Sequence, residues 1–381
     1  MRTRPRDRKQ QILAAASERF WTVGYHQVGM ADIAAAVGIG ASALYRHFRG
    51  KQELLLAILD EHLRSLEHLA ADPGRDLIPS FAAFALERRE FGVLWEREAG
   101  HLPADARRAL RHRLRSLAAA VAAATGDADR PASDLRAWAV LSILDSPSHH
   151  RTRIEPARFE QLLRAAARAV LAAELPPVVH PAPPPSHRAA AIAPASRREA
   201  LLAAAIRLFS ERGYPSVGLD DIGAAAGIAG PSVYNHFDSK IDVLTAALHR
   251  GTEALWAGLH RALAAAENPA DALDRLVADY AAFAAADKDI ISILVSEIIH
   301  LPGERRTAFR RAEVDYVTEW VTLLMAARPD LTDADARVVV QAALALVNSL
   351  SRIPHLRAHP DLAARTALLA QAIFTAETKS G

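Results

Sequence analysis

Two Glu-x-x-His pairs are the residues of this chain whose types and spacing best suit polar chemistry. Glu98 precedes His101 by three positions, and Glu297 precedes His300 by the same interval, so each pair shares one face of a helix. This spacing can hold a metal in a helical bundle, but such sites also need carboxylates from partner helices. The sequence offers no matching partner helices. We therefore predict no metal and no cofactor, and a polar group in a ligand pocket and a structural hydrogen bond both stay open.

Large aromatic side chains occur in the same regions and could line an apolar pocket. Packing in a helical core explains each of them more simply. The aromatic residues are Trp95, Trp138, Trp256, Phe283 and Trp320. As ligand-binding residues we predict Trp95, Glu98, His101, Trp138, Glu297 and His300.

Catalytic motifs are missing from the sequence. It contains no Ser-His-Asp order, no Gly-rich phosphate loop and no H-E-x-x-H helix. We therefore predict that the protein is not an enzyme.

A further set of polar residues lies on two short predicted helices, 31–37 and 42–48. Ile33 and Val37 share one face of the first helix, and Leu44 and Phe48 share one face of the second. Gly38 lies between them and suits a tight turn, because glycine accepts left-handed backbone angles. Two short helices joined by such a turn are typical of a helix-turn-helix, although two ordinary helices of an alanine-rich bundle would show the same pattern.

If Leu44 and Phe48 point inward, positions 41, 42, 45 and 46 point outward. In a helix-turn-helix, the start of the second helix enters the major groove of DNA, and free amides at a helix N-terminus favour phosphate. Tyr45, His47 and Lys51 then supply polar groups around the groove, with Lys51 placed for a phosphate.

The same pattern occurs twice. Residues 12–59 and 201–248 align at a constant offset of 189 without a gap, and close to half of the positions are identical. The two Glu-x-x-His pairs, each followed by Leu-Pro, repeat at an offset of 199. The whole subunit is therefore duplicated, with loops of different length.

The repeated stretches resemble the N-terminal DNA-binding region of TetR-family regulators, tandem type, on GYHQVGMADIAAAVGIGASALYRHFRGKQELL and GYPSVGLDDIGAAAGIAGPSVYNHFDSKIDVL. The resemblance implies an all-α fold of two TetR-like subunits in tandem, each with a three-helix helix-turn-helix domain and a helical regulatory domain that binds ligand and dimerises. The two would form an intrachain pseudo-dimer, and a further homodimer stays open.

The resemblance also places the DNA-facing residues, and the sequence adds a basic N-terminal arm for phosphates or the minor groove. Predicted DNA-binding residues are Arg4, Arg6, Ala31, Ala41, Ser42, Ala43, Tyr45, Arg46, His47 and Lys51 in the first copy, with Gly230, Pro231, Ser232, Tyr234, Asn235, His236 and Lys240 in the second.

The second copy departs from the family pattern in ways that predict weaker DNA binding. Asp220 would lie near phosphates, and Ala229 replaces a capping residue before the reading helix, where Gly40 stands in the first copy. Gly29 and Gly218 begin the preceding helix, where Ser or Thr is common.

The composition of the chain excludes several classes of site and of protein. The 381 residues include no cysteine, which excludes disulfides and zinc-thiolate sites, and 46 Lys and Arg nearly balance 44 Asp and Glu. No uninterrupted apolar run reaches the length of a membrane span, roughly 18 residues, so we predict no membrane association and a cytoplasmic, nucleoid-associated location.

The predicted order of domains is helix-turn-helix 1–60, regulatory 61–175, a Pro/Ala-rich linker 176–196, helix-turn-helix 197–249 and regulatory 250–381. The function predicted is a transcriptional repressor that reads an asymmetric double-stranded DNA operator with two unlike heads. A small apolar effector, lipid, acyl or steroid-like, would release it. The alternative is a helical ligand-binding or interaction scaffold that has lost specific DNA binding.

Overall fold

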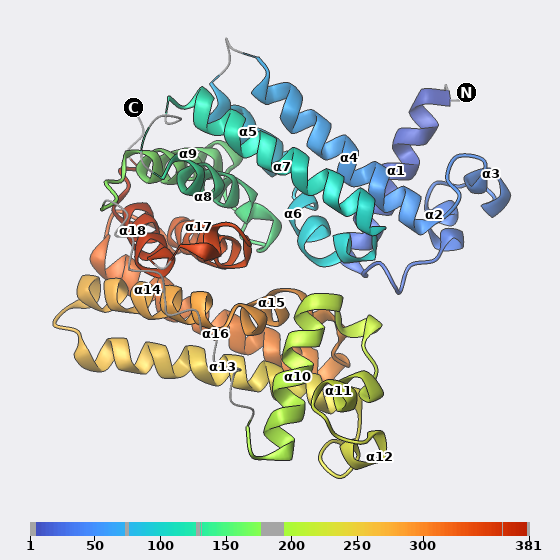
Figure 1. The fold of residues 1–381 in the computed structure, drawn as a ribbon. Helices are drawn as coiled ribbons and strands as arrows, with labels where there is room; N and C mark the ends of the chain where they lie inside the picture. The colour runs from blue at the N-terminus through green and yellow to red at the C-terminus, as the bar shows by residue number, and fades with distance from the viewer. Residues whose placement is uncertain are drawn as a thin grey trace. The chain divides into compact units, whose positions relative to one another are not determined.

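The computed structural model describes residues 5–72, 76–126, 130, 132–176, 194–359 and 361–378. Over these ranges the chain is helical and contains no strand (Figure 1), which confirms the all-α class. The chain divides into two compact units. The first comprises residues 1–151 and 155–167, and the second comprises 152–154 and 168–381.

The first unit begins with four helices: α1 (Pro5–Thr22), α2 (Met30–Ala36), α3 (Ala41–Tyr45) and α4 (Lys51–Ala70). Their core contains Ile12, Phe20, Ile33 and Leu44, all fully buried. The second short helix ends at Tyr45, earlier than the predicted 48. Phe48 nevertheless stays buried, because the chain turns there to place it beneath the motif.

The rest of the first unit surrounds the long helix α4. It contains α5 (Leu77–Glu87), α6 (Phe91–Val93), a π-helical turn at Leu94–Glu98, a 3₁₀ turn at Ala99–His101, α7 (Ala104–Ala124), α8 (Ser133–Asp145) and a 3₁₀ turn at Ser146–Ser148. Helix α9 (Pro156–Ala172) belongs to this unit up to residue 167, and its last residues belong to the second unit. Helix α7 packs against both α4 and α8.

The second unit repeats the order. It contains α10 (Arg197–Arg212), a 3₁₀ turn at Tyr214–Ser216, α11 (Leu219–Ala225), α12 (Gly230–Val233), α13 (Lys240–Ala265), α14 (Pro269–Ala286), α15 (Lys288–Ser296), a 3₁₀ turn at Ile298–His300, α16 (Gly303–Ala327), α17 (Asp333–Arg352), a 3₁₀ turn at Leu356–Ala358 and α18 (Leu362–Thr375). Helix α14 is central, packing against α13, α16, α17 and α18.

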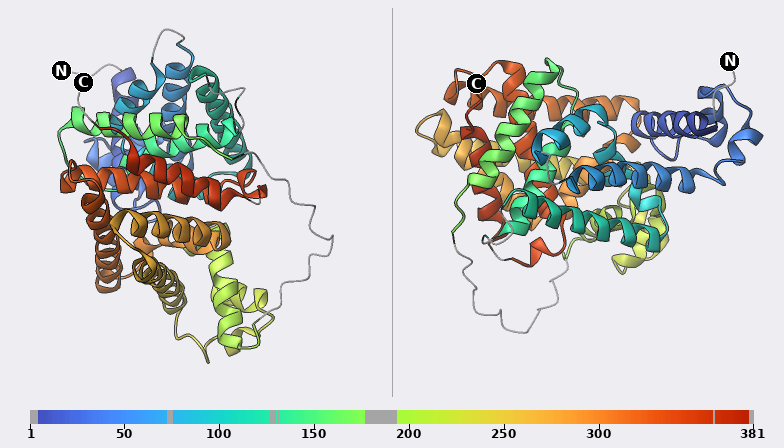
Figure 2. Two further views of the ribbon diagram at one scale, coloured as in Figure 1. Left: turned by 90° about the vertical axis from the view of Figure 1, so that its left-hand side faces the viewer. Right: turned by 90° about the horizontal axis from the view of Figure 1, so that it is seen from above.

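Each unit carries its short helices at one end of a long helix, α4 in the first unit and α13 in the second (Figures 1 and 2). The core between α14 and α16 of the second unit is aromatic. Trp320 is 1% exposed and lies edge-on to Tyr280 and Tyr316. No helix in the described part of the chain has the length and apolar character needed to cross a bilayer.

Candidate nucleic-acid interface

The turn between the two short helices has the same geometry in both units. Gly38 and Gly227 adopt left-handed angles, with φ of 67° and 68°. The amide of Ile39 donates to the Ala34 carbonyl at 3.0 Å, and the amide of Ile228 donates to the Gly223 carbonyl at 2.8 Å. The left-handed glycine lets the chain reverse and hold the second helix across the first.

The helix preceding each turn begins after a glycine, Gly29 or Gly218, which has no side chain to cap it. A carboxylate within the first turn of the helix supplies a capping hydrogen bond instead. The Gly29 amide donates to Asp32 Oδ2 at 2.7 Å, and the Gly218 amide donates to Asp221 Oδ2 at 2.8 Å. This is the reciprocal half of a capping box, which satisfies an amide that the helix itself leaves unpaired. An acidic residue three positions after each glycine was the signal in the sequence.

The predicted reading residues of the first unit are largely open to solvent. Tyr45 is 54% exposed, and Ala31, Ala41, Ser42, Arg46 and His47 are also exposed, while Ala43 is half-buried. Two members of the basic arm are not placed as side chains: Arg4 lies outside the described residues, and Arg6 lies in α1 with only its backbone described.

The second unit presents a similar surface with different chemistry. Tyr234 is 58% exposed, Asn235 is exposed, and Ser232 and His236 are half-buried. Gly230 and Pro231 begin α12, although their side chains lie outside the described part. Asp220 is exposed on α11. DNA contact by all of these residues remains a prediction.

The lysine that opens each long helix is held by the protein itself. Lys51 Nζ donates to the Tyr25 carbonyl at 2.8 Å and lies 4.6 Å from the centre of the Tyr25 ring. Lys240 Nζ makes the same contacts with Tyr214, at 2.9 Å and 4.1 Å. Partial burial lowers the pKa of both ammonium groups. Each lysine fixes the turn before the helix-turn-helix, and its contact with phosphate stays a prediction.

Each Glu-x-x-His pair contacts the tyrosine of its own unit, Tyr25 in the first and Tyr214 in the second. Glu98 Oε1 accepts from the Tyr25 amide at 3.3 Å, and His101 stacks on the Tyr25 ring with centroids 4.7 Å apart. In the second unit Glu297 Oε2 accepts from the Tyr214 amide at 3.0 Å, and His300 stacks on Tyr214 at 5.4 Å. We call each set of Tyr, Lys, Glu and His the junction cluster.

Each junction cluster joins the later helices of its unit to the short helices, because its Glu lies 73 residues beyond its tyrosine in the first unit and 83 residues beyond it in the second. Glu98 is 3% exposed and Glu297 is 6% exposed. Each carboxylate lies 3.5 Å from its histidine. Of the two roles that the sequence left open, the structure supplies hydrogen bonds to the protein, and a role in ligand binding stays a prediction.

The first junction cluster has additional charged partners. Arg97 pairs with Glu98 at 2.6 Å and donates to the Phe20 carbonyl at 2.6 Å. Burial alone would raise the pKa of Glu98, but the His101 hydrogen bond and the Arg97 charge together lower it. In the second unit Ser296 Oγ donates to Glu297 Oε1 at 2.8 Å instead.

His26 adds a further titratable ring to the first junction cluster. Its ring lies edge-on to His101 with centroids 4.3 Å apart. Partial burial, with the charges of His101 and Lys51, lowers the pKa of His26. The matching position in the second unit is Pro215, which cannot titrate.

Comparison with known proteins covers both motifs and part of the second regulatory region. The family model for bacterial regulatory proteins of the tetR family matches residues 12–58 and 201–247. A model for the tetracyclin repressor-like C-terminal domain matches residues 266–352. The chain belongs to the TetR family.

Individual relatives match parts of this chain. The transcriptional activator FasR of Mycolicibacterium smegmatis is 49% identical over 63 residues, which is 16% of this chain and 29% of FasR. The transcriptional repressor KstR2 of Rhodococcus jostii is 30% identical over 135 residues, 35% of this chain and 66% of KstR2. The chain thus spans less than two thirds of each of these relatives. A TetR-family regulator from Bordetella parapertussis superposes with a TM-score of 0.42 at 21% identity, over 46% of this chain and 94% of that one.

The remaining predicted ligand-binding residues lie in the helical part of the first unit that follows α4. Trp95 is half-buried in the π-helical turn that ends at Glu98, and Trp138 is half-buried in α8. Their contact with a ligand stays a prediction. Among the described residues, no group of three or more His, Asp or Glu side chains is arranged to hold a metal.

Proposed function

We propose that this chain is a ligand-responsive transcriptional repressor that binds double-stranded DNA through both helix-turn-helix motifs. The observation that carries the proposal is the exposed tyrosine on each reading helix. Tyr45 and Tyr234 are 54% and 58% exposed, and large aromatic side chains open to solvent at a reading helix suit contacts to a DNA backbone and groove. Similarity to the repressor KstR2 supports repression rather than activation of transcription, although the relative FasR is an activator.

The two heads are proposed to read unlike half-sites. Arg46 in the first unit corresponds to Asn235 in the second, and Ala31 corresponds to Asp220. Arginine prefers guanine and asparagine prefers adenine in the major groove. Because one chain supplies both heads, a single chain can act as the pseudo-dimer that TetR-like subunits otherwise assemble, with a homodimer of chains as a further possibility.

The junction clusters supply a route from an effector to the reading heads. Each cluster fixes the backbone just before the first short helix through the Tyr25 or Tyr214 amide. A ligand that binds one arrangement of the regulatory helices better than another shifts the population of that arrangement. Movement of Glu98 or Glu297 would then change the orientation of the reading head.

Electrophoretic mobility shift with the DNA upstream of the chain's own gene tests the proposal. We expect a discrete complex that survives excess random DNA, and that Tyr45→Ala and Tyr234→Ala each weaken. Exposed Arg275→Ala on α14 is the matched control. If neither upstream nor random DNA is bound at low salt, where phosphate contacts are strongest, the chain is a scaffold rather than a regulator.

A further inference from the structure

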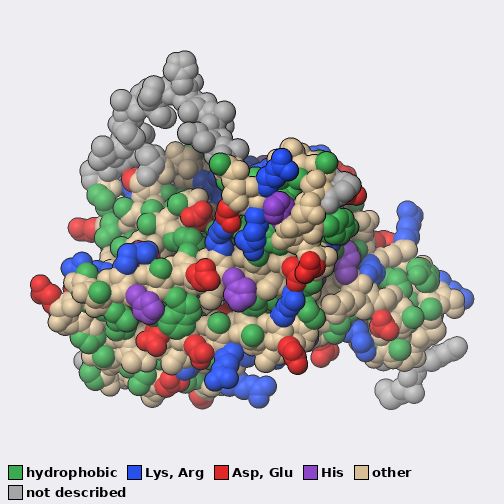
Figure 3. All heavy atoms as spheres, turned by 90° about the horizontal axis from the view of Figure 1, so that it is seen from below, with side chains coloured by type: hydrophobic (Ala, Val, Ile, Leu, Met, Phe, Trp, Pro, Cys, Tyr) green, Lys and Arg blue, Asp and Glu red, His purple; other side chains and the backbone are tan. Residues whose placement is uncertain are grey.

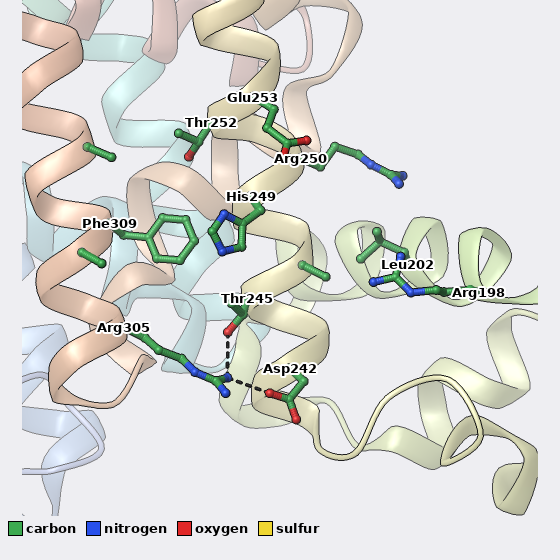
Figure 4. A pocket seen from close by; sticks show the side chains of 13 residues that line it. Arg198, Leu202, Asp242, Thr245, His249, Arg250, Thr252, Glu253, Arg305 and Phe309 are labelled. Carbon is green, nitrogen blue, oxygen red and sulfur yellow. Dashed lines mark hydrogen bonds and ion pairs between the residues drawn. The ribbon is translucent and has the colours of Figure 1, made fainter.

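A groove on the second unit lies where its helix-turn-helix meets its regulatory helices (Figure 4). It has a volume of about 760 Å³ and is lined by side chains of α10, α13 and α16. Pockets that bind small organic molecules have volumes of roughly 300–1,000 Å³. The groove is therefore large enough for such a molecule.

Three arginines line the groove, one from each helix: Arg198, Arg250 and Arg305. Two acids of α13, Asp242 and Glu253, also line it, and Arg250 pairs with Glu199. Arg305 Nη1 donates to Asp242 at 2.7 Å and to Thr245 at 3.2 Å. Both contacts use one nitrogen, so Nε and Nη2 can donate to a further acceptor, and a guanidinium binds carboxylate or phosphate oxygens in this way. On the face drawn in Figure 3, Lys and Arg side chains are interspersed with Asp and Glu.

The centre of the groove is less polar. The His249 ring faces Phe309, with centroids 4.7 Å apart (Figure 4). Leu202 and the small side chains Ala308 and Ala312 complete this region. A ligand that satisfies both parts has an anionic head and an apolar body.

The first unit provides an internal comparison, because α7 and α16 share a register. Arg107 donates to the Gly100 carbonyl at 3.3 Å, and Arg306 donates to the Ile299 carbonyl at 3.4 Å, both pairs offset by 199 residues. In that register Arg113 corresponds to Ala312.

The first unit occupies the matching space with an ion-pair network. Arg113 donates to Asp60 at 2.5 Å and to Glu67 at 2.7 Å. In the second unit the arginine is replaced by Ala312, and Asp60 and Glu61 are replaced by His249 and Arg250. The second unit has thus lost the side chain that bridges this space. Two acids have become His249 and Arg250, while Arg64 has become Glu253, an acid that also lines the groove.

One arginine of the groove also contacts the reading head. The Arg198 guanidinium lies 4.9 Å from the centre of the Phe237 ring, and Phe237 is the buried residue that follows α12. An anion that draws Arg198 into the groove would weaken this contact. The groove and the reading head are therefore connected through one side chain.

We propose that this groove binds a small organic anion, with a carboxylate or phosphate head against the arginines and an apolar body against His249 and Phe309. Its regulatory consequence, release of the second reading head from DNA, rests on the proposed function. Binding of the anion to the groove does not depend on that function.

Calorimetric titration of the full chain, without DNA, tests the site with octanoate, octyl phosphate and neutral octanol. We expect saturable binding of at least one anion and binding of octanol at least tenfold weaker. His249→Asp combined with Ala312→Arg restores the Asp60–Arg113 arm of the first unit's bridge across the groove and should weaken anion binding at least tenfold. Arg305→Gln is a second variant with smaller structural effect, and exposed Arg310→Ala on the same helix is the matched control.

Equal binding of octanoate and octanol would overturn the proposal, as would the absence of saturable binding by either anion. Anion affinity that is unchanged in both groove variants would place the ligand elsewhere and overturn it too. A mobility shift on the same samples separates the two ideas. A chain that binds DNA but no anion contradicts only the groove, whereas a chain that binds the anion but no DNA contradicts only the proposed function.

Discussion

At the scale of single residues, Glu98 and Glu297 show how a buried carboxylate can hold two parts of a subunit together. Each accepts a hydrogen bond from the backbone amide of a tyrosine and lies beside a histidine that stacks on the same tyrosine. A buried amide that loses its acceptor costs free energy. The carboxylate therefore stabilises the local backbone before each motif.

Substitution of Glu98 by alanine should loosen the first motif and leave the second unchanged. The Tyr25 amide would lose its acceptor and Arg97 would lose its ion-pair partner, at a cost of roughly 1–3 kcal/mol. We expect amide hydrogen exchange in residues 20–36 to become about 5- to 100-fold faster. Residues 209–225 of the same chain serve as the internal reference, and Glu297→Ala should reverse the pattern.

Glu98→Gln keeps an acceptor oxygen but removes the charge, so its effect should be smaller than that of Glu98→Ala. Exposed Glu87→Ala is the control for charge removal alone. Equal exchange in Glu98→Ala and the unaltered chain would show that the carboxylate does not fix the turn.

His26 should make the first unit less stable in acid. Its pKa in the folded chain is lowered from 6.5 by burial and by the charges of His101 and Lys51, against the opposing charge of Glu98. The unfolded chain therefore binds the proton first, and stability present above pH 6.5 is lost as the pH falls toward the folded pKa. Between pH 7.5 and 5.5, the melting temperature of the unaltered chain should fall further than that of His26→Gln. A parallel fall in both would contradict this role.

At the scale of elements, the left-handed backbone of the turn glycines predicts a loss of stability on substitution that does not involve side-chain packing. Gly38 has φ of 67°, and a Cβ placed on it would meet nothing within 4 Å. Gly38→Ala should therefore cost only the left-handed backbone penalty, roughly 1–2 kcal/mol, and Gly38→Asn should cost less. Urea denaturation measures the difference. Gly40→Ala, at a position with φ of −72°, is the control, because alanine adopts that angle without strain.

The helices themselves could be predicted from the sequence, since their apolar spacing survives in both copies. The predicted helix 31–37 agrees with α2, Met30–Ala36, to within one residue at each end, and the inward positions Leu44 and Phe48 are buried. The boundaries of α3 could not be predicted as well, because its last turn is set by the way Phe48 reaches the core rather than by periodicity.

The junction clusters were only partly predictable. The repeated Tyr, Lys, Glu and His were visible as identities between the copies, but their meeting depends on tertiary contacts across 73 residues in the first unit and 83 in the second. The groove could not be predicted at all from one copy, since it arises where Ala312 replaces the bridging Arg113. A comparison of charges between the copies was the signal that could have found it.

At the scale of the whole molecule, the unlike heads predict an unlike pair of half-sites. Selection of bound sequences from random DNA should return an asymmetric site whose halves are separated by about one helical turn or a multiple of it. Arg46→Ala should relax base preference in one half, with a loss of roughly 1–3 kcal/mol, and leave the other half unchanged.

A chain in which residues 41–48 are replaced by GPSVYNHF, the sequence at 230–237, carries two like reading helices. Such a chain should select more symmetric sites than the unaltered chain. Asn235→Ala is the matched control for Arg46→Ala in the second head. A palindromic site bound by the unaltered chain, with both halves protected equally, would contradict the asymmetry.

The duplication also has a genetic consequence. In a regulator assembled from separate subunits, a defective allele can be dominant negative, because normal and defective subunits form mixed dimers that do not bind DNA fully. Here the two reading heads are joined in one polypeptide and are inherited together. If a single chain is the active form, a cell that carries one defective and one normal gene keeps fully normal molecules. Loss of binding in one head would then be recessive.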